Sequence, residues 1–456
     1  MNALDLVIVV DNKIRDLTGC VLLKRKLEKL GLSVRLCPNG HEYEMLFFKP
    51  KAIIHNHMRE EHKTEIGTLQ KRIDVKAIVV PTENIMRENR DVMQLYVGKF
   101  WCEFDNIDLY ISWGEVIRQV LIEDCGMAPH RVIALGSPRT DLFHPPFQEK
   151  KDVGELKTAL YTSSHQYGSW AREVAMKKLV GCDFDKLTSF TVDEYYDEDR
   201  RAFIDYLDSM RLAVKRFSNI NFIIKPHPFE DFEPYRKLEK DIRGCQNVKV
   251  EYSAPFNSIA KDADMIIHAG TVASVEAWFM GIPTLCLEYF CRKSCHYPEM
   301  IAGSVRAQNV EDLFSYLSDF RRLQHDFAAR QKDRELYIKR WLTSADGKRS
   351  EVIAEAVRER IAPYNNPSIF RVFSAMIGRY GLLSAMRYYL RYWRRGRTSN
   401  FLPNFSEAHR QQWGDDTIAW LKRKVFTKDD LSQTERFIDE AYGKSSRPCG
   451  HAAAPR

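Results

Sequence analysis

Two short loops in the middle of the chain contain residue types that bind phosphate. The first loop, Lys225-Pro226-His227-Pro228, places a lysine and a histidine directly after a short apolar run. Lys225 and His227 can each set a positive charge against a phosphate group, and the prolines on both sides of His227 restrict the backbone. A stiff loop loses little conformational entropy when it positions a side chain. We therefore expect Lys225, His227 and Pro228 to bind a phosphorylated ligand.

The second loop also follows an apolar run and runs from His268 to the start of a helix. Gly270 allows the backbone to approach a ligand closely, and Thr271 and Ser274 offer hydroxyl and backbone N–H groups at a helix N-terminus. Glu276, in the first helical turn, is placed to accept hydrogen bonds from a ribose. Taken singly, a Pro-His turn is more often structural and such a helix start is often only a cap. On one sheet edge, the two loops together favour a nucleotide monophosphate or diphosphate site, with His268 among its residues.

Two carboxylates in the first half of the chain are candidates for a catalytic base or nucleophile. Glu83 and Asp11 each follow a predicted buried strand and therefore leave that strand toward the ligand edge of its sheet. A carboxylate there can deprotonate an acceptor hydroxyl, or attack the sugar in a retaining double displacement. The alternative for Glu83 is a helix-capping acid. The sequence leaves both interpretations open.

Basic and hydroxyl residues near the same edges complete the candidate set. Arg15 and Arg139 are candidates for binding an acidic sugar or a lipid phosphate, although Arg139 and Asp141 could equally form a salt bridge. For Asp141 we favour a structural role. Ser163 and Ser164 begin the second half of the chain after a predicted strand, where they are placed to contact donor phosphate.

The sequence does not indicate a metal ion or a resident cofactor. Asp197-Glu198-Asp199 matches the D-x-D pattern of metal-dependent transferases, but acids are ordinary at the start of a helix, and we interpret the match as accidental. Cys291, Cys295 and His296 are not followed by a second ligand pair at zinc-site spacing. We expect a nucleotide sugar to serve as co-substrate, without a metal.

Alternating apolar strands and helical patterns organise these residues into two similar halves. Near-continuous apolar strands separated by helices predict parallel sheets covered on both faces. The expected strands are 6–10, 34–37, 52–55, 77–80, 109–112 and 132–135, then 158–161, 222–224, 248–251, 265–268 and 284–287, with a helix at 18–30. We predict a GT-B fold of two Rossmann-like doubly wound domains facing a cleft, with a helical C-terminal extension. The expected domains are 1–147 for the acceptor, 148–345 for the donor, and 346–456 for a basic extension with a disordered tail.

The excess positive charge is concentrated in that extension. The net charge is +7, and residues 364–405 contain seven arginines but no lysine or acid; without them the chain has 62 basic and 62 acidic residues. This distribution disfavours nucleic-acid binding, which needs a basic face on the main fold. Helical spacing places Met386, Tyr389, Leu390 and Trp393 on one face and the arginines on the other, at Arg387, Arg391, Arg394 and Arg395. A packing helix with a solvated face is the alternative to contact with an anionic membrane.

The N-terminus lacks a secretion signal, and no stretch approaches the roughly 20 apolar residues that span a bilayer. We therefore expect a cytoplasmic protein that contacts the inner face of the cytoplasmic membrane peripherally.

The two loops resemble the HP loop and the following serine/threonine loop of bacterial surface-polysaccharide transferases. These families are the capsule Kdo transferases, the bacterial sialyl- and polysialyltransferases, and the CDP-glycerol polymerases of teichoic acid synthesis. The resemblance implies that His227, Pro228, Thr271 and Ser274 bind the phosphate of a cytidine nucleotide. Residues 11–17 and 136–142 are similar to surface carbohydrate biosynthesis proteins. Where the sialyltransferases carry an acidic-acidic-glycine motif, this chain reads Thr-Glu-Asn, so only Glu83 matches.

The resemblance implies a metal-independent glycosyltransferase. We expect transfer of an acidic sugar, Kdo or a sialic-acid-like sugar, from a CMP-activated donor to a growing polysaccharide or glycolipid. The alternatives are CDP-glycerol glycerophosphotransfer, a nucleotide-sugar 2-epimerase, and a non-catalytic scaffold of a polysaccharide assembly complex.

Overall fold

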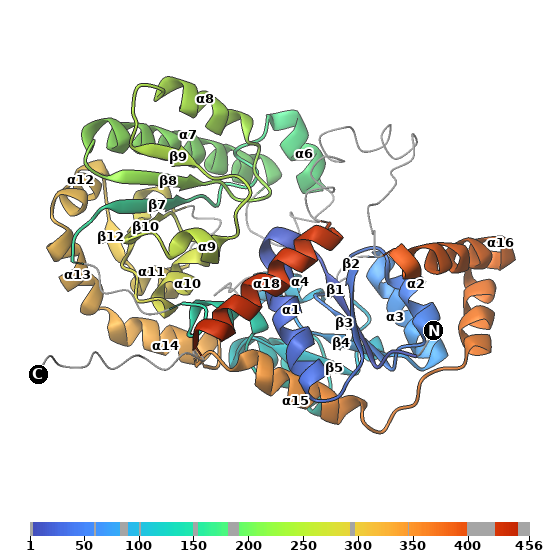
Figure 1. Cartoon of the computed structure of the whole chain (residues 1–456). Coiled ribbons are helices and arrows are strands. Elements are labelled where there is room, and N and C mark those ends of the chain that lie inside the picture. The colour runs from blue at the N-terminus through green and yellow to red at the C-terminus, as the bar shows by residue number, and fades with distance from the viewer. Residues whose placement is uncertain are drawn as a thin grey trace, which may run out of the picture.

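The chain folds around two separate parallel β-sheets (Figure 1). The structure is a computed structural model that describes residues 3–58, 61–82, 90–99, 102–148, 154–180, 191–291, 297–344, 346–398 and 425–445. Each sheet has six strands, and helices cover both of its faces. Most of the inner strands are buried on both faces, which explains why their sequences are continuous apolar runs.

The first sheet has the strand order β2-β1-β3-β4-β5-β6, and every neighbouring pair is parallel. The order reverses between β1 and β3, which makes this the switch point where ligands bind in doubly wound sheets. The bounds are β1 (Leu6–Val10), β2 (Val34–Pro38), β3 (Ala52–His55), β4 (Lys76–Val79), β5 (Leu109–Ser112) and β6 (Val132–Ala134). The helices between them are α1 (Lys13–Lys29), α2 (Glu42–Met45), α3 (Glu61–Ile73), α4 (Arg90–Val97) and α5 (Glu115–Gln119), with short 3-10 turns at η1 (Leu46–Phe48) and η5 (Pro138–Phe143).

The second sheet has the order β12-β11-β10-β7-β8-β9 and is also parallel throughout. Its switch point lies between β7 and β10, because the connections run to opposite sides from there. The bounds are β7 (Thr158–Thr162), β8 (Asn221–Lys225), β9 (Val248–Val250), β10 (Met265–His268), β11 (Thr284–Leu287) and β12 (Val305–Ala307). The helices are α6 (Arg172–Val180), α7 (Val192–Arg216), α8 (Glu233–Asp241), α9 (Phe256–Ala260), α10 (Ala273–Phe279), α11 (Pro298–Ala302), α12 (Val310–Ser318), α13 (Phe320–Ala328) and α14 (Gln331–Trp341).

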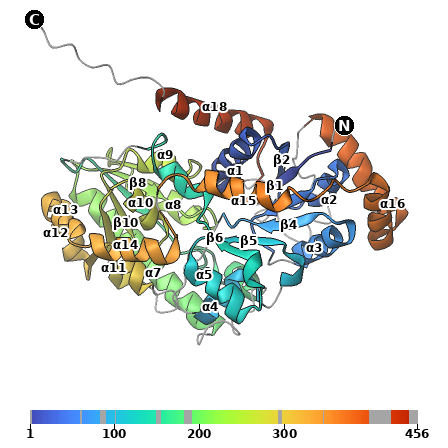
Figure 2. The same cartoon turned by 90° about the horizontal axis from the view of Figure 1, so that it is seen from below.

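The last helices return to the first sheet. Helix α15 (Arg349–Ile361) and helix α18 (Lys428–Ser445) both pack on α1 (Figure 2). Asp141 of η5 accepts hydrogen bonds from the backbone N–H groups of Arg349 and Ser350, at 2.8 and 2.7 Å, and so caps the start of α15. The structural role predicted for Asp141 is therefore confirmed. Helix α16 (Ile369–Thr398) packs on α2, η1 and α3 at the outer edge of the first sheet.

The predicted fold class is confirmed, with two doubly wound parallel sheets and a helical C-terminal extension. The first helix begins at Lys13 rather than at the predicted Thr18, because the side chain of Asn12 accepts the N–H of Ile14 and caps it there. Strand β12 was not predicted. Among the described helices, none has the length and apolar content to cross a bilayer, and within the described residues no cluster of metal-ligating side chains occurs.

Candidate functional site

A single buried carboxylate, Glu230, joins the loops at the carboxyl ends of β7 and β8. One of its oxygens accepts the hydroxyl of Ser163 and the backbone N–H of His165, both at 2.7 Å. The other accepts the backbone N–H of His227 at 3.0 Å and the hydroxyl of Tyr235 at 2.6 Å. Burial raises the pKa of Glu230, and these donors oppose that shift. Two loops far apart in the sequence are thereby held in one arrangement.

His227 lies half-buried at the surface of this arrangement. Its Nδ1 accepts the backbone N–H of Phe229 at 3.2 Å, and its Nε2 lies 3.3 Å from the amide nitrogen of Gln166. A histidine ring that accepts at Nδ1 carries its proton on Nε2, so the end of the ring beside Gln166 is a hydrogen-bond donor. Lys225 is buried at the end of β8, where its Nζ donates to the carbonyl of Tyr252 at 3.4 Å, and burial lowers its pKa to about 8.

The loop after β10 lies beside Ser164, across the switch point of the second sheet. The hydroxyl of Ser164 donates to the carbonyl of Ala269 at 3.4 Å. Gly270 has a φ of 77°, a backbone conformation that favours glycine. The hydroxyl of Ser274 is buried and donates to the carbonyl of Thr271 at 2.7 Å, so it shapes the turn. The side chain of Thr271 is half-buried, and its hydroxyl accepts the backbone N–H of Ala273 at 3.4 Å.

His268 does not lie where the sequence interpretation placed it. Its ring is fully buried, with Nε2 3.0 Å from the hydroxyl of Ser304 and Nδ1 accepting the N–H of Gly270 at 3.2 Å. Burial lowers its pKa to about 3, so the ring stays neutral. We therefore correct its role from donor contact to support of the loop that follows it.

Asp199, part of the D-x-D match, has a structural function. It is fully buried; one oxygen lies 2.9 Å from Nδ1 of His165, and the other accepts the N–H groups of Tyr167 and Gly168 at 3.0 and 2.7 Å. These hydrogen bonds agree with the interpretation of the D-x-D match as accidental. Asp199 and Glu230 therefore both bind the loop that follows β7, each through hydrogen bonds from that loop.

Arg139 and Glu276 form an ion pair between the two halves of the chain. Nη2 of Arg139, on η5, lies 2.7 Å from Oε1 of Glu276, on α10. The alternative pairing of Arg139 with Asp141 is not formed, because Asp141 caps α15 instead. Glu276 is 4% exposed, and its second oxygen has no hydrogen-bond partner among the described residues. Burial raises its pKa, and Arg139 opposes that shift.

The switch point of the first sheet holds a network of local ion pairs. Arg15 lies between two acids, with Nη2 3.0 Å from Asp11 and Nε 2.6 Å from Asp16. Asp11 also accepts the side-chain amide of Asn39 at 3.0 Å, and Asp16 accepts the backbone N–H of Asn12 at 3.0 Å. Asp16 is buried, whereas Asp11 stays partly accessible at the end of β1.

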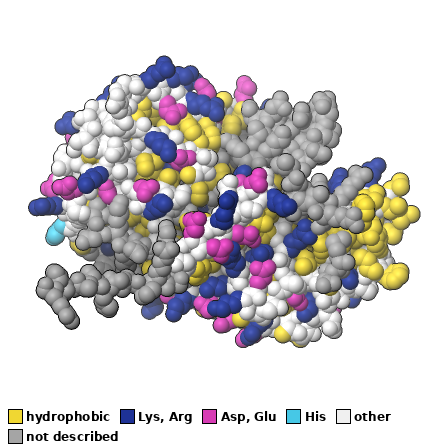
Figure 3. All heavy atoms as spheres, viewed as in Figure 1, with side chains coloured by type: hydrophobic (Ala, Val, Ile, Leu, Met, Phe, Trp, Pro, Cys, Tyr) yellow, Lys and Arg dark blue, Asp and Glu magenta, His cyan; other side chains and the backbone are white. Residues whose placement is uncertain are grey.

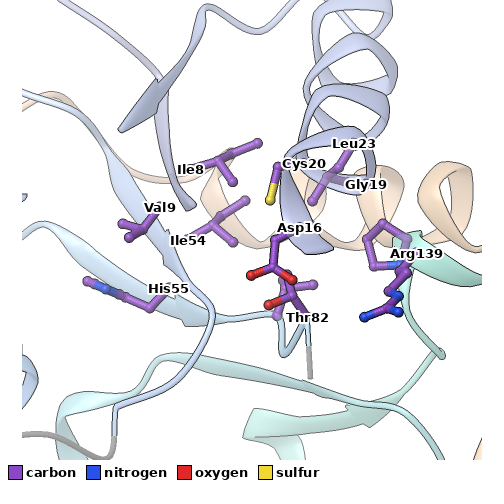
Figure 4. A pocket seen from close by; sticks show the side chains of 12 residues that line it. Ile8, Val9, Asp16, Gly19, Cys20, Leu23, Ile54, His55, Thr82 and Arg139 are labelled. Atoms are coloured by element: carbon purple, nitrogen blue, oxygen red, sulfur yellow. The ribbon is translucent and has the colours of Figure 1, made fainter. Parts of the chain in front are cut away.

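A small, mainly apolar pocket opens beside this network (Figure 4). The polar groups in its wall are Asp16, His55, Thr82 and Arg139, and the apolar ones include Cys20. The buried hydroxyl of Thr82 has no hydrogen-bond partner among the described residues. Because Arg139 lines the pocket and also pairs with Glu276, the pocket and helix α10 of the second half meet at this residue.

Several predicted positions lie outside the described residues. These are Glu83, Cys295 and His296, together with the side chains of Arg394 and Arg395. Glu230 was missed by sequence reasoning, and its only signal was its place three residues after His227 in the same loop.

The comparisons with known proteins support the fold. No protein-family model matches the sequence, and no curated protein does either. Three similar solved structures are described here. A UDP-N-acetylglucosamine 2-epimerase has a TM-score of 0.50 and 12% identity, over 81% of this chain and 99% of that one. The wall teichoic acid polymerase TagF has a TM-score of 0.50 and 12% identity, over 78% of this chain and 89% of that one. The UDP-GlcNAc 2-epimerase from Neisseria meningitidis has a TM-score of 0.48 and 13% identity, over 78% of this chain and 100% of that one.

At such identities the likeness is one of fold. This chain is similar to those proteins in its two facing Rossmann-like domains, and the GT-B fold is thereby shown.

Proposed function

We propose that this chain transfers a glycosyl group from a nucleotide-activated donor to a growing surface polysaccharide or glycolipid. One observation carries the proposal. The Arg139–Glu276 pair brings the pocket at the first switch point against the α10 loop, which borders the second switch point. Two ligand edges in contact are what a reaction between two bound substrates requires.

On the donor side, His227 is the central group. As a donor, its Nε2–H suits a phosphate oxygen of the nucleotide, and such a bond strengthens as negative charge develops on the leaving group. Thr271 offers a second donor, and Ser163 and Ser164 line the loop opposite. The unpartnered oxygen of Glu276 suits a ribose hydroxyl. We propose that these groups neutralise the leaving nucleotide without a metal ion.

On the acceptor side, Asp11 is the base that the described residues offer, with Glu83 as its rival. The acceptor hydroxyl gives its proton to the carboxylate while its oxygen bonds to the anomeric carbon and the bond from that carbon to the phosphate oxygen breaks. Arg15 and Arg139 provide positive charge for an acidic sugar or a lipid phosphate. A lipid-linked acceptor at an anionic membrane fits this proposal.

The donor we propose is a CMP-activated acidic sugar. This choice is supported by the resemblance of the His227-Pro228 loop and the Thr271 loop to cytidine-nucleotide sites. CDP-glycerol glycerophosphotransfer would use the same loops but carry a phosphate to the product. A 2-epimerase would act without any acceptor.

The proposal is tested by thermal stabilisation with CMP, CDP, UMP, UDP and GDP on the wild-type chain, on His227→Ala and on a matched control, His325→Ala. His325 is an exposed histidine on α13. We expect a CMP-selective shift that His227→Ala removes and His325→Ala keeps. A UDP- or GDP-selective shift overturns the donor, and no shift with any nucleotide overturns the enzyme proposal in favour of a scaffold. Release of CMP from CMP-Kdo or CMP-sialic acid, measured with and without an acceptor glycan, then separates transfer from epimerisation.

A further inference from the structure

The outward face of α16 is a feature of the described residues that the proposed reaction does not use. Gly381, with φ 77° and ψ 163°, divides the helix into two segments that meet at a corner (Figure 1). The inward side of both segments packs on α2, η1 and α3 through buried residues, among them Val372, Met376, Ala385 and Tyr392. The corner is therefore firmly attached to the first domain.

The opposite side of α16 is apolar and exposed. Phe370 is 84% exposed, Leu383 75% and Leu382 58%. Of the twelve large hydrophobic side chains exposed in the described part of the chain, seven belong to this helix, the others being Ile377, Met386, Leu390 and Trp393. They form a continuous apolar surface at the end of the molecule (Figure 3). Scattered apolar residues are normal on a protein surface, but such a concentration marks an interaction site.

This face differs from the one that the sequence suggested. Tyr389, expected beside Met386 and Leu390, turns inward and packs on Phe47, with ring centroids 5.4 Å apart. Met386, Leu390 and Trp393 stay outside as expected. The exposed surface also extends past Gly381 into the first segment, which the sequence analysis did not include.

Every charged residue of α16 is an arginine. Arg371 and Arg387 are exposed, and Arg371 donates to a backbone carbonyl at 3.2 Å, which leaves its charge uncompensated by that contact. Arg379 pairs with Glu65 at 2.5 Å, and Arg391 lies 4.0 Å from Glu44. Within residues 364–405 all seven charged residues are arginines. The helix therefore combines an exposed apolar face with positive charge, and Arg371 and Arg387 have no acidic partner among the described residues.

We propose that this face docks the chain on a lipid bilayer that contains anionic lipids, with the α16 corner inserted among the headgroups. The combination of apolar side chains, a tryptophan and surrounding arginines suits the interfacial region of such a bilayer. A second copy of the chain fits less well, because a two-fold contact through this face would bring the arginines of both copies together. The proposal goes beyond the proposed reaction and does not depend on the donor.

The test is co-sedimentation of the full chain with vesicles, either of phosphatidylcholine alone or of phosphatidylcholine with an equal share of phosphatidylglycerol. The variants are Leu382→Ser with Leu383→Ser, Arg387→Gln, and the matched control Leu336→Ser. Leu336 is a 65% exposed leucine on α14, outside the proposed surface. Circular dichroism on each variant verifies folding, which these exposed positions should leave intact.

We expect preferential binding to the anionic vesicles. The double leucine variant should weaken it about tenfold, Arg387→Gln about fivefold, and Leu336→Ser should leave it unchanged. Equal loss in Leu336→Ser, or no binding to either vesicle, overturns the proposal. A dimer detected by light scattering that the double leucine variant dissociates, without vesicle binding, assigns the face to a second copy instead.

Discussion

At the switch point of the second sheet, polar groups from distant parts of the chain converge on one carboxylate, whereas at that of the first sheet they pair mainly with close neighbours. Ser163 and Glu230 are 67 positions apart. By contrast, Arg15 bonds to Asp11 and Asp16, four and one positions away. The edge of the second sheet is held by hydrogen bonds between distant segments, whereas the edge of the first sheet is held largely by contacts within the first turn of α1.

The difference has a physical consequence for each edge. Removing a group that several buried donors share leaves all of them without partners, at about 1–3 kcal/mol each. Removing one member of the partly exposed Arg15–Asp11 pair costs less, because water replaces the lost partner. The buried Asp16 has fewer distant donors than Glu230. We therefore expect the edge of the second sheet to respond to substitution through stability and geometry, and the edge of the first sheet mainly through chemistry.

The largest expected effect tests this contrast directly. Glu230→Ala removes the partner of two hydroxyl and two backbone N–H groups, and should lower the free energy of unfolding by about 4 kcal/mol. Asp16→Ala, the buried acid of the first edge, should lower it by about 2 kcal/mol. Denaturant unfolding measures both. Tyr235→Phe, which removes one donor to Glu230, should cost about 1 kcal/mol. Equal losses at Glu230 and Asp16 would mean that the two edges do not differ.

The second prediction concerns chemistry at the first edge. Asp11→Asn keeps the shape of the side chain but removes its basicity, so turnover should fall roughly 100-fold while nucleotide affinity stays the same. Steady-state kinetics and nucleotide titration separate the two effects. The surface variant Asp205→Asn on α7 serves as control. If Asp11→Asn is active and Glu83→Gln is not, the base is Glu83.

Much of the fold could be predicted from the sequence because its strands are buried on both faces. The runs at Leu6–Val10 and Met265–His268 match the predicted strands at both ends. Strand β12 could not be found this way, because it has three residues and the middle one, Arg306, is exposed. Its apolar signal is too short to stand out.

The site was predictable only in part, for a related reason. His227 and Thr271 follow apolar strands, and that position is visible in the sequence. Glu230 and Asp199 act through partners that only the folded chain brings near, so in the sequence they are ordinary acids. His268 shows the reverse: it is the last residue of a strand, but its ring is fully buried.

The third prediction asks whether the two edges are energetically coupled. Arg139→Met leaves Glu276 buried without its partner and should lower the free energy of unfolding by about 2 kcal/mol. Glu276→Gln added to it should recover about half of that loss, because the buried charge is gone. A double-mutant cycle from denaturant unfolding gives the coupling energy. A coupling energy near zero would show that the contact does not join the domains.

The smallest expected effect follows from the buried amine of Lys225, at the edge of the second sheet. Burial lowers the pKa of Lys225 to about 8, whereas an unfolded lysine titrates near 10.4. Between these values the unfolded chain binds more protons than the folded one, so this group makes stability rise with pH. The rise should be about 1 kcal/mol from pH 8 to pH 9. Denaturant unfolding at both values, on the wild-type chain and on Lys225→Met, isolates it. The exposed control Lys215→Met should show the same rise in the free energy of unfolding as the wild-type chain, whereas Lys225→Met should not show it. If Lys225→Met also shows the wild-type rise in stability from pH 8 to pH 9, the amine of Lys225 is solvated. The edge of the second sheet is then more open to water than its hydrogen bonds indicate.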